Sequence, residues 1–162
     1  MASNHEFYSQ CWSHELPAFV RVLKALPSEK LDYRPHEKNS CAGDIAWQLA
    51  QEMAQIKELV ETGVINFSLP PRPTNGDEIV AAFEKAAEPT LTALKNVDDA
   101  KWASKGDFRM NGASVWSGTI QELSWGYLFD MIHHRGQLST YIRPMGGKVP
   151  SIYGPSGDDQ GS

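Results

Sequence analysis

The sequence contains little cysteine, no strong excess of charge of one sign and no long apolar run. Cys11 and Cys41 are the only two cysteines in 162 residues, too few for a disulfide framework, and we expect both thiols to be reduced. The net charge of −5 argues against nucleic acid, which proteins bind through basic contacts to phosphate. No apolar run approaches the roughly 20 residues that cross a bilayer. We therefore expect neither a nucleic-acid partner nor a membrane.

Common targeting signals and cofactor-binding motifs are also missing. The first residues, MASNHEFYSQ, contain no basic segment followed by an apolar one, so no signal peptide is predicted and we expect a cytoplasmic protein. Neither of the glycine-rich phosphate loops, G-x-x-x-x-G-K-S/T and G-x-G-x-x-G, occurs. Ser139 and the two cysteines have no recognisable base and orienting group beside them, which disfavours a nucleophilic hydrolase.

The composition suits one globular domain. With 162 residues, of which 41% are apolar, the chain is long enough to bury a core without disulfides or a metal. We expect a single helical domain over residues 1–155 and a flexible C-terminal tail over residues 156–162, which ends in the polar sequence GDDQGS.

Apolar residues recur every three or four positions in four segments, the spacing of one face of a helix. The first segment covers residues 8–26 and contains Pro17, which should kink the helix or mark its true start. The second follows Ser40 as its N-cap and ends near Gly63. Residues 63–75 are rich in proline and are expected to form a connecting loop.

The third segment covers residues 77–94. It opens at a predicted capping box of Thr74 and Asp77 and contains Pro89, which should kink or split the helix. Periodicity is then lost, and residues 98–116 are predicted to form a long crossing loop without strands.

The fourth segment is the clearest helix. Thr119 and Glu122 form a T-x-x-E capping box, the apolar face continues through residues 120–141, and Pro144 and Gly146 end it. Four long amphipathic helices predict an all-α fold, a four-helix bundle with a long crossover connection. The long connections argue against a simple up-down-up-down arrangement with tight turns.

Asp130 and His134 lie four residues apart on the last helix, so their side chains share one face. That face is otherwise apolar and should point into the bundle, where a carboxylate is costly unless it is paired or binds a metal. Two metal-capable side chains at this spacing are a recurring way to bind a divalent ion. The alternative is a buried hydrogen-bonded pair that only packs the helices.

A metal site needs a further ligand from another helix, and the second helix offers Gln48 and Glu52 at the same spacing. Glu52 is a good hard ligand, whereas the neutral amide of Gln48 donates weakly to zinc or nickel. The alternative for these two residues is a solvated helix face, which we favour for Glu52. His133 points about 100° away from its neighbour on the helix and is expected near the surface or around the site. Arg135 is expected to pair with a carboxylate.

Two stretches of the sequence resemble the DinB/YfiT-like superfamily. Residues 31–53, LDYRPHEKNSCAGDIAWQLAQEM, resemble the entry into its second helix, and residues 130–154, DMIHHRGQLSTYIRPMGGKVPSIYG, resemble its last-helix signature. The resemblance covers nearly the whole chain. It implies a DinB-like bundle, often dimeric, with a divalent metal at one end held by three histidines, two of them in a His-x-x-x-His pair on the last helix. Some relatives are transferases or isomerases that depend on low-molecular-weight thiols.

This sequence departs from the three-histidine pattern at two positions. Gln48 occupies the position on the second helix and Asp130 the first position of the pair, so that only His134 is retained. The resemblance thus implies a metal site of Gln48, Asp130 and His134. The residues expected around this site or in its pocket are Glu52, His133, Arg135 and Gln137. Such an oxygen-rich site suits manganese or iron better than zinc or nickel.

Two functions follow as hypotheses. The first is a metal-dependent enzyme, more specifically a thiol-dependent transferase, that acts on a small molecule with a thiol as partner. The alternative is a metal-free small-molecule-binding or interaction module in which the altered site is degenerate. A third, minor hypothesis is a thiol-reactive sensor that uses Cys11 or Cys41. The resemblance and the five tryptophans, more than a core of this size needs, lead us to expect a homodimer.

Overall fold

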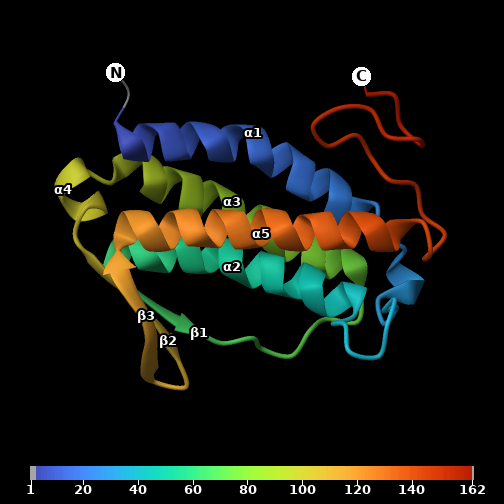
Figure 1. Ribbon diagram of the computed structural model, residues 1–162, viewed down its shortest axis with the longest axis horizontal. Coiled ribbons are helices and arrows are strands. Elements are labelled where there is room, and N and C mark those ends of the chain that lie inside the picture. The colour runs from blue at the N-terminus through green and yellow to red at the C-terminus, as the bar shows by residue number, and fades with distance from the viewer. Residues whose placement is uncertain (1–2, 162) are drawn as a thin grey trace.

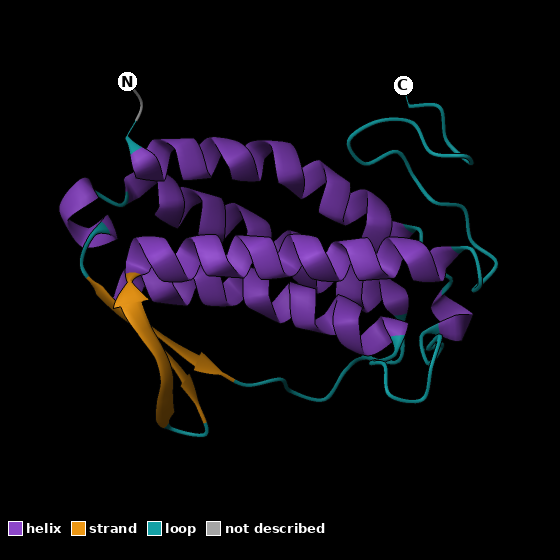
Figure 2. Cartoon of the chain, in the orientation of Figure 1, coloured by secondary structure: helices purple, strands orange, loops and turns teal. Residues whose placement is uncertain are grey.

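The computed structural model describes residues 3–161, and its four long helices form a bundle (Figures 1 and 2). The helices are α1 (Asn4–Lys24), α2 (Ala42–Thr62), α3 (Gly76–Asn96), the short α4 (Asp99–Trp102) and α5 (Ile120–Ile142), with one 3-10 turn at Ser28–Lys30. Around the bundle the long helices follow the order α1, α3, α2, α5, and each packs against the next. The predicted four-helix bundle is therefore confirmed.

The long crossover connects α2 to α3. Helices α1 and α5 run in one direction and α2 and α3 in the other (Figure 1). Because α2 and α3 are parallel neighbours, residues 63–75 return along the length of the bundle. The arrangement is not up-down-up-down, as the long connections predicted. Residues 98–116 do not cross the bundle, because α3 ends and α5 begins at the same end (Figure 1).

A small sheet stands beside α2 and α5 (Figure 2), and the prediction of a strandless loop over residues 98–116 is wrong. Its strands are β1 (Val64–Phe67), β2 (Lys105–Met110) and β3 (Ala113–Thr119). β1 is parallel to β2, and β2 is antiparallel to β3. Asn111 and Gly112 make the hairpin turn with φ of 51° and 80°, the left-handed backbone that an Asn-Gly turn adopts readily. The sheet was missed because most of β3 is exposed and shows no alternation of apolar and polar residues.

The two prolines inside predicted helices do not interrupt them. Pro17 lies within α1, which begins well before it, and α1 bends in its second half (Figure 1). Pro89 lies within α3, which is continuous rather than split. The capping box of Thr119 and Glu122 is confirmed, with both of its hydrogen bonds present. Gly63 is confirmed as the C-cap of α2, with φ of 80°.

Two predicted helix starts need correction by one residue. The N-cap of α2 is Cys41, whose side chain makes no capping bond, rather than Ser40. The N-cap of α3 is Asn75, whose side chain accepts a hydrogen bond from the Asp77 amide, rather than Thr74. Asparagine caps helices as well as threonine does, so the sequence alone did not separate the two positions.

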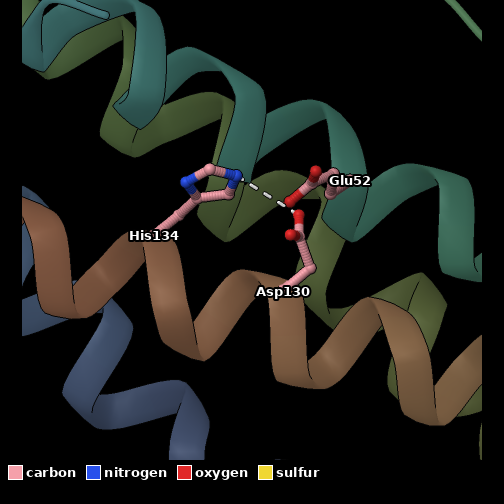
Figure 3. Close-up of side chains that lie close together, drawn as sticks. All are labelled: Glu52, Asp130 and His134. Carbon is pink, nitrogen blue, oxygen red and sulfur yellow. Dashed lines mark ion pairs between the residues drawn. The ribbon is translucent and has the colours of Figure 1, made fainter. Parts of the chain in front are cut away.

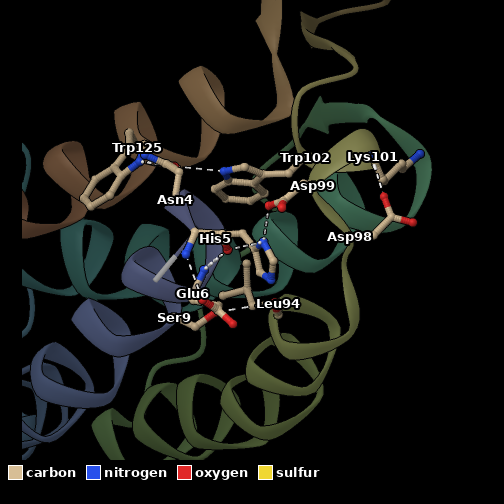
Figure 4. Close-up of polar contacts among 11 residues, drawn as sticks. Asn4, His5, Glu6, Ser9, Leu94, Asp98, Asp99, Lys101, Trp102 and Trp125 are labelled. Atoms are coloured by element: carbon tan, nitrogen blue, oxygen red, sulfur yellow. Dashed lines mark hydrogen bonds and ion pairs between the residues drawn. The ribbon is translucent and has the colours of Figure 1, made fainter. Parts of the chain in front are cut away.

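A polar cluster joins the beginning of α1 to α4 and α5 (Figure 4). Asn4 accepts hydrogen bonds from the indoles of Trp102, at 2.9 Å, and Trp125, at 3.1 Å. His5 lies 2.9 Å from Asp99 at the start of α4. These contacts hold the end of the bundle at which the hairpin begins.

The core lies between the four long helices and includes fully buried aromatic and aliphatic side chains from each of them. Trp12, Phe19, Leu49, Phe83 and Leu138 are among them. Among residues 3–161, no helix combines the length and the apolar character that crossing a membrane requires.

The expected C-terminal tail folds back on the preceding residues as far as the structure describes it. Asp158 accepts hydrogen bonds from the Arg143 guanidinium at 2.8 Å and from the Val149 amide at 2.9 Å. Asp159 accepts one from the Ser151 amide at 2.8 Å. Residue 162, the last of the predicted tail, lies outside the described residues.

Candidate metal centre between α2 and α5

Three side chains with metal-ligating atoms converge between α2 and α5 (Figure 3). Glu52 comes from α2, and Asp130 and His134 come from α5. One potential ligand atom from each lies within 4.8 Å of the other two. Within the group, Asp130 Oδ2 lies 3.3 Å from His134 Nε2.

The local sequence explains why these groups meet. Asp130 and His134 are one helical turn apart on α5, and Gln48 and Glu52 are one turn apart on α2. Because α2 and α5 are packed neighbours, the two pairs face each other along the same seam. Fully buried apolar side chains such as Met53 on α2 fix the rotation of the helices.

Glu52 is the most buried member of the group, with only 3% of its surface exposed, so the expectation of a solvated helix face is wrong. Its Oε1 accepts a hydrogen bond of 2.7 Å from Gln48 Nε2. Its Oε2 is buried and has no hydrogen-bond partner among the described residues. Burial raises the pKa of Glu52 from 4.5 to about 7, because the charged form is poorly solvated there.

His134 is held on both sides of its ring. Its Nδ1 lies 2.8 Å from Gln137 Oε1, an acceptor, so Nδ1 carries the proton. Its Nε2 faces Asp130 and lies 3.1 Å from Gln48 Nε2. The hydrogen bond to Asp130 raises the pKa of His134 to about 9, and the same contact lowers the pKa of Asp130.

Asp130 lies at the rim rather than inside the bundle. Its side chain is 52% exposed, whereas that of His134 is 19% exposed. The expectation that both point into an apolar core is therefore correct only for the histidine. The next residue of the same helix, Met131, is the one that is fully buried.

The other residues expected at the site lie in different places. Gln48 is adjacent, but its amide nitrogen rather than its oxygen faces the group: it donates a hydrogen bond to Glu52 Oε1 and lies 3.1 Å from His134 Nε2. His133 is exposed, and its ring centroid lies 5.4 Å from that of His134. Arg135 points away from the group and forms an ion pair of 2.6 Å with Glu15 on α1.

A cavity of about 470 Å³ adjoins two of the three side chains, Glu52 and Asp130. Gln48, Glu52 and Asp130 contribute its polar surface. The remaining lining consists of apolar and aromatic residues and one glycine, namely Phe67, Phe108, Met110, Trp116, Gly126 and Tyr127. Four of them belong to the sheet and were not identified from the sequence. The Asn-Gly turn after Met110 was the one signal that indicated a hairpin there.

The two cysteines do not belong to this site. Neither Cys11 nor Cys41 lines the cavity, and both are free thiols. Burial raises the pKa of each, which lowers the fraction of reactive thiolate at neutral pH. Both features disfavour the hypothesis of a thiol-reactive sensor.

Comparison with known proteins places this architecture among related chains. A family model described as "DinB family" matches residues 1–160. The Bacillus subtilis (strain 168) protein YrdA, described as an uncharacterized protein, is 26% identical over 163 residues, which cover 95% of this chain and 90% of YrdA.

Two solved structures share the fold. A DinB-like protein from Bacillus cereus ATCC 10987 gives a TM-score of 0.74 at 22% identity, over 90% of this chain and 95% of that one. The DinB-like protein YjoA from Bacillus subtilis gives 0.68 at 14% identity, over 96% and 99%. At these identities the likeness shows the fold, and it confirms the helical bundle that the sequence predicted.

Proposed function

The chain belongs to the DinB family, and on that premise we propose that Glu52, Asp130 and His134 hold a divalent cation for an enzyme that acts on a small molecule in the adjoining cavity. The observation that carries this proposal is the buried Glu52 Oε2, which has no hydrogen-bond partner among the described residues. A buried acceptor without a partner costs about 1–3 kcal/mol, and more when it is charged. A cation between the three groups would supply the missing interaction.

The donor set fits a divalent cation. Two carboxylates and one imidazole provide two hard oxygen ligands and one nitrogen, which favours manganese or iron over zinc or nickel. The two negative charges balance the charge of the ion. Gln137 supports the fit, because a hydrogen bond to Nδ1 fixes a metal-binding histidine with its other nitrogen free.

In this proposal Gln48 supports the site and is not a ligand, which differs from the triad implied by the family resemblance. Its amide group holds Glu52 Oε1 at 2.7 Å. When bound, a divalent cation acts as a Lewis acid and lowers the pKa of a coordinated water or thiol. The aromatic residues of the cavity exclude water from the substrate, and Asp130 at the rim faces the solvent side.

The reaction class that we propose is group transfer to or from a small-molecule thiol, which the family resemblance implies. Because neither Cys11 nor Cys41 lines the cavity, the thiol has to enter as a co-substrate. This part is tested by following the displacement of chloride from chlorodinitrobenzene by 2-mercaptoethanol. We expect the metal-loaded protein to accelerate the reaction and Glu52→Gln to remove the acceleration.

The metal site is tested by elemental analysis and calorimetric titration with Mn²⁺, Fe²⁺ and Zn²⁺ on untagged protein. We expect close to one equivalent in the wild type and a loss of binding in Glu52→Gln and His134→Gln. His133→Gln is the matched control, because it removes an exposed neighbouring imidazole and should leave the stoichiometry unchanged. Gln48→Leu separates the two triads: we expect weaker binding with one equivalent retained, whereas a ligand role for Gln48 predicts loss.

The second candidate function is a metal-free binding module. It is favoured by the contacts that the group already makes without a cation, between Gln48 and Glu52 and between Asp130 and His134. Wild-type protein that takes up none of the three ions, with stability unaffected by EDTA, would reject the metal site and support this module. Unchanged metal content in folded Glu52→Gln and His134→Gln would also contradict the proposed ligands.

A further inference from the structure

We infer that the cavity beside Glu52 takes an aromatic substrate that carries no anionic group, and that Trp116 is the residue that selects for its ring. The inference rests on the proposed function in one respect: it takes this cavity as the substrate site. It adds the chemical class of the substrate and a specificity-determining residue on the hairpin.

The register of the sheet brings its aromatic side chains to one face. Phe108 on β2 lies directly opposite Trp116 on β3, and Phe67 on β1 lies opposite Met110 on β2. Phe108 and Met110 are two residues apart and therefore point to the same side of their strand. All four line the cavity, so the sheet presents a continuous aromatic and thioether surface to the bundle.

The rings also contact one another across three elements. The centroids of Phe67 and Phe108 are 5.7 Å apart, and those of Phe108 and Tyr127 on α5 are 6.0 Å apart. The Tyr127 hydroxyl donates a hydrogen bond of 2.9 Å to Gln55 Oε1, so this polar group is already paired. Ring surfaces arranged in this way favour an aromatic ligand over a saturated one of the same size.

The Trp116 ring packs against α5 because residue 126 of that helix is a glycine. A Cβ atom at Gly126 would lie 2.3 Å from the Trp116 ring, a distance that no side chain could adopt. The indole therefore rests directly on the backbone of α5, one turn before Asp130. Trp116 remains 43% exposed, so it stands at the edge of the cavity where a ligand enters.

The charges at the cavity exclude anions. No lysine or arginine belongs to its lining, and Glu52 and Asp130 supply its carboxyl groups. Arg109 lies between Phe108 and Met110 in sequence but on the other face of β2, where its Nε pairs with Asp107 at 2.6 Å. In the metal-free protein, a carboxylate or phosphate on the ligand would meet two acidic side chains, because His134 already pairs with Asp130 at 3.3 Å and does not belong to the lining.

Three probes of similar size test the inference on full-length protein treated with EDTA and then freed of it. Benzamide is uncharged and aromatic, benzoate is its anionic counterpart, and cyclohexanecarboxamide is its saturated counterpart. Dissociation constants are measured by ligand-observed NMR. We expect benzamide to bind about 2- to 10-fold more tightly than cyclohexanecarboxamide, and benzoate at least about tenfold more weakly than benzamide.

Two variants assign the ring preference to the hairpin. Trp116→Leu should abolish the preference for benzamide over cyclohexanecarboxamide, and Trp116→Phe should retain most of it. Phe129→Leu is the matched control, because Phe129 is an exposed aromatic residue, 62% accessible, that does not line the cavity. Circular dichroism and thermal unfolding establish that each variant is folded.

The inference is overturned if benzoate binds as tightly as benzamide, if the saturated probe binds as tightly as the aromatic one, or if none of the probes binds. It is also overturned if Trp116→Leu and Phe129→Leu behave alike. Metal content is measured on the same preparations before EDTA treatment. Ring selectivity without metal binding would reject the proposed function and leave this inference standing, and metal binding without selectivity would do the reverse.

Discussion

Helix α5 carries a charged cluster on each of two faces, and the clusters differ in how completely their polar atoms are paired. On the face toward α1, Arg135 is 2% exposed and donates hydrogen bonds to Glu15 at 2.6 Å and to the Tyr153 hydroxyl at 2.5 Å. Tyr153 in turn lies 2.9 Å from Glu15. The Arg135 guanidinium also lies over the rings of Phe19 and Tyr153, at 4.5 and 5.0 Å.

The face toward α2 is paired less completely. Glu52 is as deeply buried as Arg135, but its Oε2 has no partner among residues 3–161. A buried charge therefore does not by itself mark a functional site. A closed network such as that of Arg135 holds elements together, whereas an acceptor that no other group satisfies is a place where a ligand can bind.

The largest expected effect is on the closed cluster, which consists of Glu15, Arg135 and Tyr153. Arg135→Met should lower the free energy of unfolding by about 3–5 kcal/mol, because it leaves the Glu15 carboxylate without its cationic partner in a site that is 14% exposed. Denaturant unfolding measures the change. The metal content of the protein that remains folded should be unchanged, since Arg135 points away from Glu52.

The double variant Glu15→Leu with Arg135→Met provides the control. Removing both partners eliminates the unpaired charge, so we expect it to recover a large part of the lost stability. A loss below about 1 kcal/mol in the single variant, the range of an exposed ion pair, would show that the cluster does not hold α1 and α5 together.

The next effect concerns Glu52, Asp130 and His134, which we call the open cluster. Here, removing the buried charge should raise the free energy of unfolding rather than lower it. Glu52 has a pKa of about 7 in the folded protein and an ordinary value of 4.5, so the folded state retains a proton that the unfolded state has lost between these values. The metal-free wild type should therefore lose stability as pH rises from 4.5 through 7, by up to about 3 kcal/mol. Glu52→Gln should remove this loss and be more stable than the wild type at pH 8.

Denaturant unfolding across pH in the presence of EDTA measures this difference. A second decline, between pH 6.5 and 9, should persist in Glu52→Gln, because His134 also has a raised pKa and loses its favourable charge there. Glu61→Gln is the control, since it removes an exposed carboxylate from the same helix and should change stability by less than about 0.5 kcal/mol. Parallel curves for the wild type and Glu52→Gln between pH 4.5 and 7 would contradict the buried, unpaired state of Glu52.

The sequence predicted the helices and two of the three residues that converge between α2 and α5. Periodicity and the Thr119 capping box located α5, and a spacing of four residues was enough to pair Asp130 with His134. It misplaced Glu52, because burial on α2 depends on how that helix is rotated against α5 and α3. Two residues of one helical face differ little in pattern even when one is buried and the other is not.

The sheet and its side of the cavity were not predictable in the same way. Strand β3 is exposed over most of its length, so it has no apolar alternation, and β1 has only four residues. The connection that forms the crossover was not predictable either, because the directions of α2 and α3 are set by tertiary packing. The Asn111–Gly112 turn was the local signal that favoured a hairpin over a loop.

The smallest effect distinguishes a residue that supports the open cluster from the residues that would bind the metal. Gln137→Leu removes the acceptor that lies 2.8 Å from His134 Nδ1, and His134 then has no side chain to fix its ring orientation from that side. Groups that hold a metal-binding histidine in this way contribute about 10- to 100-fold to metal affinity, equivalent to about 1.4–2.7 kcal/mol. We expect titration with Mn²⁺ to show this loss with one equivalent still bound.

The control is Gln121→Leu, about 24 Å away along α5, which should bind Mn²⁺ as the wild type does. Equal affinities in the two variants would mean that Gln137 serves the packing of α5, as Arg135 does, and would remove it from the open cluster.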